Sequence, residues 1–471
     1  MRKFYWYTMA YAKKHGWVFF SSLVLAMIVF GGLVPLLSRN LVQKPREYIG
    51  LVGQYSLYSL PTEIKNSLSV GLTKIETDGS AKPLLAERWV LEDENKRYRF
   101  VLKKKIKWQD GKELVPEDIN YNFNDVETLT TPNDVIFKLP EVFTPFPSVV
   151  SEPIFRQTTE KQWWFFERPN LIGIGENRIA DYTLKGNWLK QIVIDGPDKR
   201  QIYRFYLTED EAVLAFKRGE VDALSDLSTL RDIASWKTTT TKKKLQTDQY
   251  LAVFFNTASP VLPKSVRQAL AYALPTITDE TRATGPINPK SWAYLAGGKV
   301  YDQDLTRAVE RLLDAAPVEP LNLELTTTSI FAAEAEAYRQ QWDNLGMKAY
   351  EACLGKKTAK DKAFEALNCD NLKIKVTLKI TNFPDTGNFQ LLLMGQKSPP
   401  DPDQYFLWHS SQPTNITHYK NTRIDSLLEK GRQTLNQAER ETIYQEFQQF
   451  LLEDPPAIFI KYLTTFEVKR K

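Results

Sequence analysis

Few residues in this chain of 471 are placed to do covalent chemistry. Of its three histidines, His409 and His418 lie nine residues apart, with no acidic residue at a spacing typical of metal ligands. We find no G-x-S-x-G nucleophile turn, phosphate-binding loop or H-E-x-x-H zinc motif. A hydrolase would need a nucleophile and a base brought together from distant segments. We therefore predict a protein without catalytic residues, metal site or cofactor.

The two cysteines, Cys353 and Cys369, lie sixteen residues apart in a polar stretch. In an oxidising compartment they can join in a disulfide, which stabilises a fold by roughly 3 kcal/mol in the chain-entropy model. The alternative is two unlinked thiols. Because two sulfurs with no histidine nearby make a poor zinc site, the pair is a disulfide candidate rather than a metal site.

The basic charge is concentrated at one end of the chain. The whole sequence has 62 Lys and Arg against 57 Asp and Glu, but residues 1–47 hold seven basic groups and one acid. The remaining residues carry a net charge of −1. A nucleic-acid-binding protein would need a basic field on its folded body, so we predict no nucleic-acid partner.

Residues Trp17 to Leu37 form an uncharged, mostly apolar run of 21 residues. As a helix this run would be about 31 Å long, close to the thickness of a bilayer core. A cleaved signal peptide would have a shorter apolar region and a small-residue cleavage site, and a buried helix of a soluble domain is the other alternative. We predict a cytoplasmic tip and transmembrane anchor in residues 1–47, crossing at 17–37, with a single-pass topology. Four basic residues before the run against three after it favour an extracytoplasmic body.

The body mixes strands and helices. Residues 48–60 are typical of a strand and turn, and Asp110–Gly111 predicts a tight turn because glycine tolerates positive φ. Pro116, followed by two acids, predicts a helix start, with Ile119, Phe123 and Val126 on its buried face. After residue 170 strands and helices alternate, which indicates an α/β or mixed α+β fold.

Six segments in order resemble the extracellular solute-binding proteins of family 5, the receptors of peptide and nickel ABC importers. The resemblance runs from about residue 48 to 465. Its motifs are KPLLAERW with the following hairpin, WQDG and PED; FKRGEVDAL; VFFNTASPVLPKSVRQALAYAL; GPINP with YDQDLTRAVERLLDAA; PPDPDQYFLWHSS; and HYKNTRIDSLLEKG with EDPPAIFI.

The resemblance implies a non-catalytic receptor with a two-lobed, periplasmic-binding-protein-like fold of type II. Residues 48–255 with 445–471 would form the first lobe and 256–444 the second. A peptide or similar small solute would be captured between the lobes and favour their closure. The implied partners are ABC permease and ATPase subunits. The alternative is a structural or interaction protein that keeps the fold and has lost transport.

The same resemblance implies ligand contacts from both lobes. Ser398 stands where peptide-binding relatives have an aspartate that pairs with the ligand's α-amine, and serine offers no charged partner for an ammonium group. Asp401 and Asp403 could substitute for that aspartate, or shape a turn beside Pro402. The expected contacts are Tyr55, Tyr58, Phe254 and Asn256 from the first lobe and the crossover, and Trp292, Gly395, Ser398, Asp401, Asp403 and Trp408 from the second.

Overall fold

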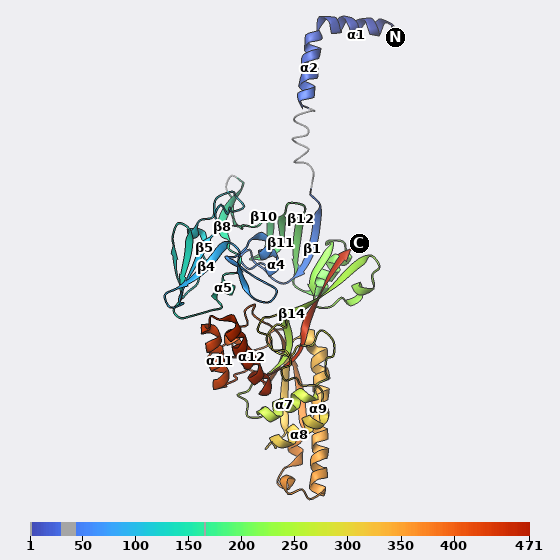
Figure 1. Cartoon of the computed structure of the whole chain (residues 1–471). Coiled ribbons are helices and arrows are strands. Elements are labelled where there is room, and N and C mark those ends of the chain that lie inside the picture. The colour runs from blue at the N-terminus through green and yellow to red at the C-terminus, as the bar shows by residue number, and fades with distance from the viewer. Residues whose placement is uncertain (1, 30–43, 164–165) are drawn as a thin grey trace.

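A ten-stranded sheet runs through the body of the protein. The structure is a computed structural model that describes residues 2–29, 44–163 and 166–471 (Figure 1). The strands in spatial order are β10 (Arg178–Lys185), β11 (Trp188–Asp195), β12 (Arg200–Tyr206), β1 (Arg46–Val52), β13 (Ala223–Leu227), β18 (Ala457–Arg470), β14 (Thr239–Phe255), β17 (Leu391–Lys397), β15 (Leu321–Thr327) and β16 (Ile374–Ile380).

The two long strands β14 and β18 join two lobes. They pair antiparallel from Thr239 opposite Arg470 to Phe254 opposite Ala457, with register shifts between Gln246 and Ala252. Strand β13 pairs with the C-terminal half of β18, whereas β17 pairs with the C-terminal half of β14. Each lobe is therefore built on a different half of the same strand pair (Figure 1). The register shifts lie between the two halves. We call the body that carries β1 lobe 1 and the body that carries β15–β17 lobe 2.

Lobe 1 adds small sheets and short helices to its part of the large sheet. A four-stranded sheet has the order β4 (Ala86–Glu92), β5 (Arg97–Leu102), β7 (Asp134–Lys138) and β6 (Glu127–Thr130). Rings of Phe100, Phe137 and Phe146 pack together in its core. The other elements are α4 (Thr62–Leu68), β2 (Thr73–Ile75), β3 (Ala81–Pro83), the 3-10 turn η2 (Pro116–Asp118), α5 (Phe146–Val149), β8 (Arg156–Trp163), β9 (Phe166–Ile172), α6 (Glu209–Lys217) and η3 (Arg231–Ser235).

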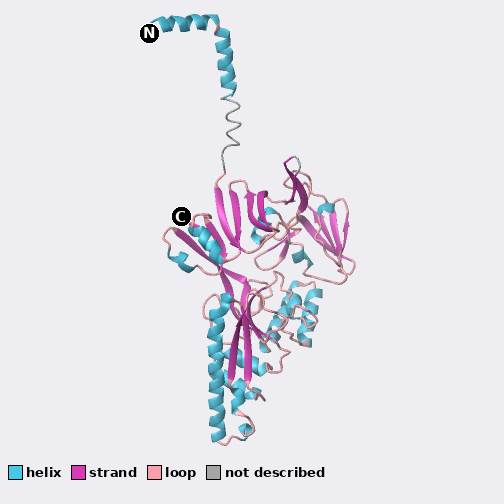
Figure 2. Cartoon of the chain, turned by 180° about the vertical axis from the view of Figure 1, so that it is seen from behind, coloured by secondary structure: helices cyan, strands magenta, loops and turns pink. Residues whose placement is uncertain are grey.

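Helices cover both faces of the sheet in lobe 2 (Figure 2). On β14, Leu251, Val253 and Phe255 face one core, whereas Tyr250 and Phe254 face the other. This double burial explains the unbroken apolar run at residues 250–255. The first core is completed by α7 (Lys264–Ala273), α8 (Leu305–Ala315) and α9 (Ala332–Thr358), and the second by α10 (Tyr405–Trp408), α11 (Thr422–Gln433) and α12 (Gln437–Glu453).

The segment 445–453 lies in α12, which packs against α11 in lobe 2. The predicted boundaries had grouped this segment with lobe 1. The two helices share the core around Leu428, Tyr444 and Phe447, so the chain returns to the strand pair only with β18. The remaining boundaries stay a prediction.

The predicted helix after Pro116 is wrong, because the turn η2 ends at Asp118. Asn122 has a φ of +53°, which no α-helix continues. Its backbone N–H donates to the Asn120 side chain at 2.8 Å. The hydroxyl of Tyr121 donates to the Val150 carbonyl oxygen at 2.8 Å. Local side-chain bonds therefore compete with the helical ones and hold this segment as a loop against the four-stranded sheet.

At the N-terminus the structure describes two helices, α1 (Arg2–Lys14) and α2 (Gly16–Ile28). None of the described helices is both long enough and apolar enough to cross a membrane. Residues 30–37 of the predicted span lie outside the described residues.

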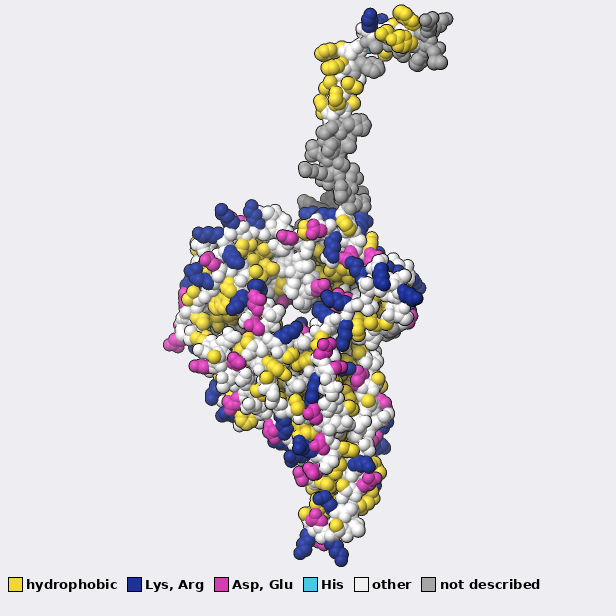
Figure 3. Space-filling model, turned by 45° about the vertical axis from the view of Figure 1, so that its right-hand side comes forward, with side chains coloured by type: hydrophobic (Ala, Val, Ile, Leu, Met, Phe, Trp, Pro, Cys, Tyr) yellow, Lys and Arg dark blue, Asp and Glu magenta, His cyan; other side chains and the backbone are white. Residues whose placement is uncertain are grey.

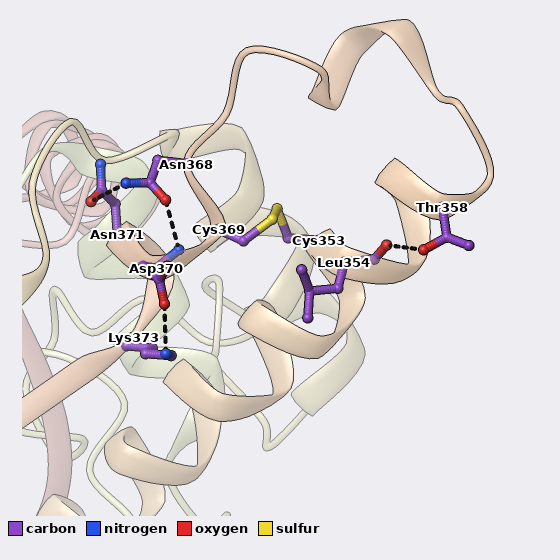
Figure 4. Close-up of a disulfide and its surroundings, with 8 residues drawn as sticks. All are labelled: Cys353, Leu354, Thr358, Asn368, Cys369, Asp370, Asn371 and Lys373. Carbon is purple, nitrogen blue, oxygen red and sulfur yellow. Dashed lines mark hydrogen bonds and ion pairs between the residues drawn. A yellow bond between two sulfur atoms is a disulfide. The ribbon is translucent and has the colours of Figure 1, made fainter.

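Cys353 and Cys369 form a disulfide with an S–S distance of 2.02 Å (Figure 4). It joins the C-terminal part of α9 to the turn before β16. Near it the Thr358 hydroxyl donates to the Leu354 carbonyl oxygen at 2.9 Å, within the last turns of α9. The bond therefore closes the loop that leaves α9.

Replacing both cysteines with serine is expected to lower the free energy of unfolding by roughly 3 kcal/mol, because the unfolded chain regains the freedom of a loop of this length. Urea unfolding of the oxidised wild type and of the double variant measures the difference. Reduced wild type serves as the control and should match the double variant. Equal stability of all three samples would show that this loop is already constrained by its packing.

Candidate ligand-binding cleft between the lobes

Among the described residues, backbone hydrogen bonds join the two lobes at two places beside the cleft. At the first, the Trp292 backbone N–H of lobe 2 donates to the Asp78 carbonyl oxygen of lobe 1 at 3.0 Å. Next to this bond, a Cβ atom built on Gly79 would lie 2.5 Å from the carbonyl oxygen of Pro400. At the second, the Thr144 backbone N–H donates to the Arg432 carbonyl oxygen at 2.8 Å. The structure thus has its lobes in contact.

A cavity of about 440 Å³ lies beside the second contact. From lobe 1 it is lined by Phe143, Pro145, Ser148 and Val149, and from lobe 2 by residues 397–401, Asp403, Phe406 and Leu407. The exposed surface of its wall is mostly carbon, and the Phe406 side chain is 56% exposed. Such a wall suits an apolar group of a ligand.

A second cavity of about 380 Å³ lies beside the first contact. It is lined by residues 75–77 and Gly79 of lobe 1, by 244–248 of β14, and by lobe 2 residues that include Asn288, Lys290 and 397–400. The segment 397–400 lines both cavities, so it runs between them. Charges of both signs face this second cavity, and the Lys397 Nζ lies 3.8 Å from a carboxylate oxygen of Asp248. The two cavities together form the cleft.

Beneath the cleft, two carboxylates are held in buried ion pairs. Asp401 accepts from the Arg440 guanidinium at 2.8 Å, and Asp403 lies 3.0 Å from the guanidinium of Arg432. All four side chains are buried. Burial raises the pKa of the Asp401 carboxyl, and the Arg440 charge opposes that rise. These carboxylates are engaged by arginines of α11 and α12.

Aromatic rings enclose both guanidinium groups. The Arg432 group lies 3.8 Å from the ring centroid of Tyr405 and 5.1 Å from that of Phe143. The Arg440 group lies 5.2 Å from the Trp292 ring centroid. Cation–π contacts of this kind strengthen when water is excluded. Because Phe143 belongs to lobe 1, Arg432 connects the buried ion pair to the contact between the lobes.

Ser398 is the other predicted residue that lines the two cavities, whereas Trp292 lies at the first contact between the lobes through its backbone N–H. The Ser398 hydroxyl donates to the Pro286 carbonyl oxygen at 2.6 Å, and its backbone N–H donates to the Asp248 carbonyl oxygen at 2.8 Å. The side chain is 3% exposed. Ser398 therefore fixes the segment 397–400 to β14 and to the loop before Trp292, and its hydroxyl hydrogen is already used.

The structure places the other predicted residues away from these two cavities. Phe254 and Trp408 pack in the lobe 2 core with ring centroids 6.4 Å apart. Asn256 directly follows β14, and its side chain donates to the Phe389 carbonyl oxygen at 2.9 Å. The other three are Gly395 within β17, Tyr55 against Phe205 in lobe 1, and Tyr58 beside a separate lobe 1 cavity of about 380 Å³.

Sequence reasoning missed Gly79 and Phe143 of lobe 1 and both arginines of lobe 2. The sequence does contain a pattern that marks Arg440. Tyr444 and Phe447 follow it at i+4 and i+7, so the three residues share one face of a helix. A charge on an apolar face needs a buried counter-ion. No comparable pattern marks the two lobe 1 residues, since both lie in loops.

Comparison with known proteins agrees with this architecture. Residues 80–418 match the family model of bacterial extracellular solute-binding proteins, family 5, middle region. The probable D,D-dipeptide-binding periplasmic protein DdpA of Escherichia coli is 21% identical, over 86% of this chain and 83% of its own.

Two solved structures share the fold. NikZ from Campylobacter jejuni in complex with Ni(L-His) aligns with a TM-score of 0.67 and 21% identity, over 91% of this chain and 95% of its own. The oligopeptide-binding protein AppA from Bacillus subtilis in complex with a nonapeptide aligns with a TM-score of 0.63 and 19% identity, over the same shares. The predicted mixed α/β, two-lobed fold is confirmed. Members of the matched family are binding proteins rather than enzymes. Because its model matches well over half of the sequence, the chain belongs to the bacterial extracellular solute-binding proteins of family 5.

Proposed function

We propose that this protein is the membrane-anchored solute-binding component of an ABC importer and captures a peptide or similar small solute between its lobes. The observation that carries the proposal is the cleft, in which each cavity is lined from both lobes. A ligand that contacts both walls stabilises the closed arrangement relative to the open one. The names of the relatives, which include dipeptide- and oligopeptide-binding proteins, support a peptide.

The two cavities indicate how such a ligand would be held. An apolar side chain would occupy the cavity beside Phe143 and Val149, and the polar part of the ligand would extend past the segment 397–400 toward Lys244 and Lys290. The carboxylates around Ser398 already have cationic partners: Asp401 and Asp403 are paired with buried arginines, and Asp248 lies 3.8 Å from the Lys397 Nζ. We therefore propose that the ligand's N-terminal charge contributes little to binding.

The anchor would be residues 17–37. Its support is the apolar run in the sequence and the exposure of large apolar side chains on α2, among them Trp17, Phe20 and Leu25. Lys13 and Lys14 at the end of α1 would lie at the cytoplasmic face. Permease and ATPase subunits would receive the cargo from the body on the other side.

Capture from a mixed peptide library, read by native mass spectrometry of the full chain in detergent, tests the proposal. We expect saturable binding of peptides with apolar side chains, and N-acetylated forms should bind within about threefold of free forms. A charge-assisted hydrogen bond to the amine would instead be worth about 1.5–3 kcal/mol, a loss of roughly 10- to 150-fold on acetylation. A library from which nothing is retained would favour the structural or interaction role.

A further inference from the structure

The end of lobe 1 at which β1 begins carries more cations than acids. The buried Asp195 carboxylate has Lys44 Nζ at 3.4 Å, Arg200 Nε at 3.4 Å and an Arg178 nitrogen at 3.5 Å. Burial opposes ionisation of this carboxyl, yet the surrounding cations hold its pKa below the ordinary value. One negative charge therefore faces three positive charges, and all three cationic side chains remain at least 39% exposed.

The neighbouring Glu47 repeats this arrangement. Lys199 Nζ lies 2.6 Å and Lys469 Nζ 2.5 Å from its carboxylate oxygens, and both lysines are at least half exposed. Arg46 beside it is exposed. We call the surface formed by Lys44, Arg46, Arg178, Lys199, Arg200 and Lys469 the basic end. Its six cations meet three acids, Asp195, Glu47 and the exposed Asp198 of the turn before β12, which leaves a net charge of +3.

The basic end is also where the chain arrives from the N-terminal helices (Figures 1 and 3). Only six residues separate Leu37 from Lys44, so even a fully extended link spans about 25 Å at most. If residues 17–37 cross a bilayer, the start of β1 is tethered close to the headgroups. The attraction of anionic headgroups for Lys and Arg acts within about a Debye length of the surface.

We infer that the basic end docks on the anionic lipid headgroups of the membrane that holds the anchor; this inference rests on the anchor in the proposed function. Every residue of the basic end belongs to lobe 1 or to the C-terminal part of β18. Docking therefore fixes lobe 1 against the membrane and leaves lobe 2 able to move about the β14–β18 pair. The membrane surface orients the body, and ligand capture takes place on the side away from it.

Amide hydrogen exchange of the full chain in lipid nanodiscs tests this inference. We expect the turn at residues 195–200 to exchange more slowly in discs with about one-third anionic lipid than in zwitterionic discs. The triple variant Arg46→Gln, Arg178→Gln, Lys199→Gln leaves Asp195 with Lys44 and Arg200 and leaves Glu47 with Lys469, so the fold is kept. Since each cation near such a surface contributes about a factor of five, the variant should lower the equilibrium constant for docking by roughly 100-fold and remove the lipid dependence of the exchange.

The matched control is Lys103→Gln, Lys104→Gln, Lys105→Gln, which removes the same charge from exposed residues after β5 and should keep the lipid dependence. Equal exchange at 195–200 in the two kinds of disc would overturn the inference, as would equal effects of both triple variants. Co-elution with discs in high salt tests the anchor separately. If the chain does not stay with the discs in high salt, docking is measured instead as binding of the chain to anionic discs in low salt. Absence of that binding would also overturn the inference.

Discussion

Replacing Arg440 with methionine is expected to lower the free energy of unfolding by about 3–5 kcal/mol, because a buried carboxylate loses its counter-ion. Methionine fills a similar volume, so the loss reports the charge of Asp401 rather than a cavity. Arg440 also packs on the Trp292 ring and donates to the Gly431 carbonyl oxygen at 2.9 Å. Urea unfolding monitored by tryptophan fluorescence measures the change.

Two further variants separate charge from packing. Arg423→Met removes an arginine whose partner Glu446 lies on the surface, and exposed pairs are worth only about 0–1 kcal/mol. Asp401→Asn combined with Arg440→Met removes both charges of this pair, leaves the Asp403–Arg432 pair intact, and should recover most of the lost stability. A double variant as unstable as Arg440→Met alone would show that Arg440 acts through packing.

The Arg440→Met variant should also respond to pH in a defined direction. Burial raises the folded-state pKa of Asp401 above its unfolded value, and the opposing arginine is gone. The folded variant then binds a proton more readily than the unfolded chain does. The loss of unfolding free energy relative to the wild type is therefore complete above the folded-state pKa and shrinks as the pH falls toward about 3.9. Urea unfolding of the wild type and of Arg440→Met at pH 7 and at pH 5 measures this change. A stability loss that is larger at pH 5 than at pH 7 would contradict a buried, unpaired Asp401 carboxylate.

Replacing Gly79 with alanine is expected to weaken ligand binding by about 5- to 150-fold, because the new methyl group would overlap the Pro400 carbonyl oxygen when the lobes meet. Relieving such an overlap costs about 1–3 kcal/mol. The open arrangement carries no such penalty, so the variant shifts the population away from closure. Titration calorimetry with a peptide retained from the library measures the affinity.

Gly111→Ala is a closely matched control. Gly79 and Gly111 have nearly the same φ, +84° and +85°, but a Cβ atom on Gly111 meets nothing within 4 Å. Both variants should therefore lose similar stability from the left-handed backbone, while only Gly79→Ala loses affinity. Equal affinities of the two variants would mean that this contact between the lobes plays no part in capture.

Local features of the fold were predictable where one residue or a short pattern decides the structure. Strand β1 (Arg46–Val52) overlaps the start of the segment predicted at 48–60, and Gly111 has the positive φ that its turn requires. The segment LAVFFN at 251–256 predicts a buried strand whichever core each side chain faces, and β14 runs through this segment to Phe255. The order of the family motifs then indicated two lobes, which no single segment could have done.

The cleft could not be assembled from the sequence in the same way. Asp401 and Arg440 are 39 residues apart and meet only because α11 and α12 fold back over the segment 401–408. The residues next to Asp401 in the sequence do not indicate that its ion-pair partner is Arg440. Phe143 reaches the cleft from a loop of lobe 1, where neither spacing nor hydrophobic period marks it.

Two aromatic residues near the family motifs were expected at the ligand but lie in the core of lobe 2. Phe254 and Trp408 were expected at the ligand because they flank the crossover and the DPD motif. Strand alternation puts Phe254 on the same face as Tyr250. Which helices cover that face is decided by residues 405–453, far along the chain, and they enclose both rings in the core of lobe 2.

Small-angle scattering of the wild-type protein with and without a saturating captured peptide tests the capture of solute by lobe closure most directly. We predict that the peptide lowers the radius of gyration of the wild type and has a much smaller effect on Gly79→Ala at the same concentration. A peptide that binds with no change in the wild-type scattering curve, or the failure of any solute to bind, would contradict capture by closure.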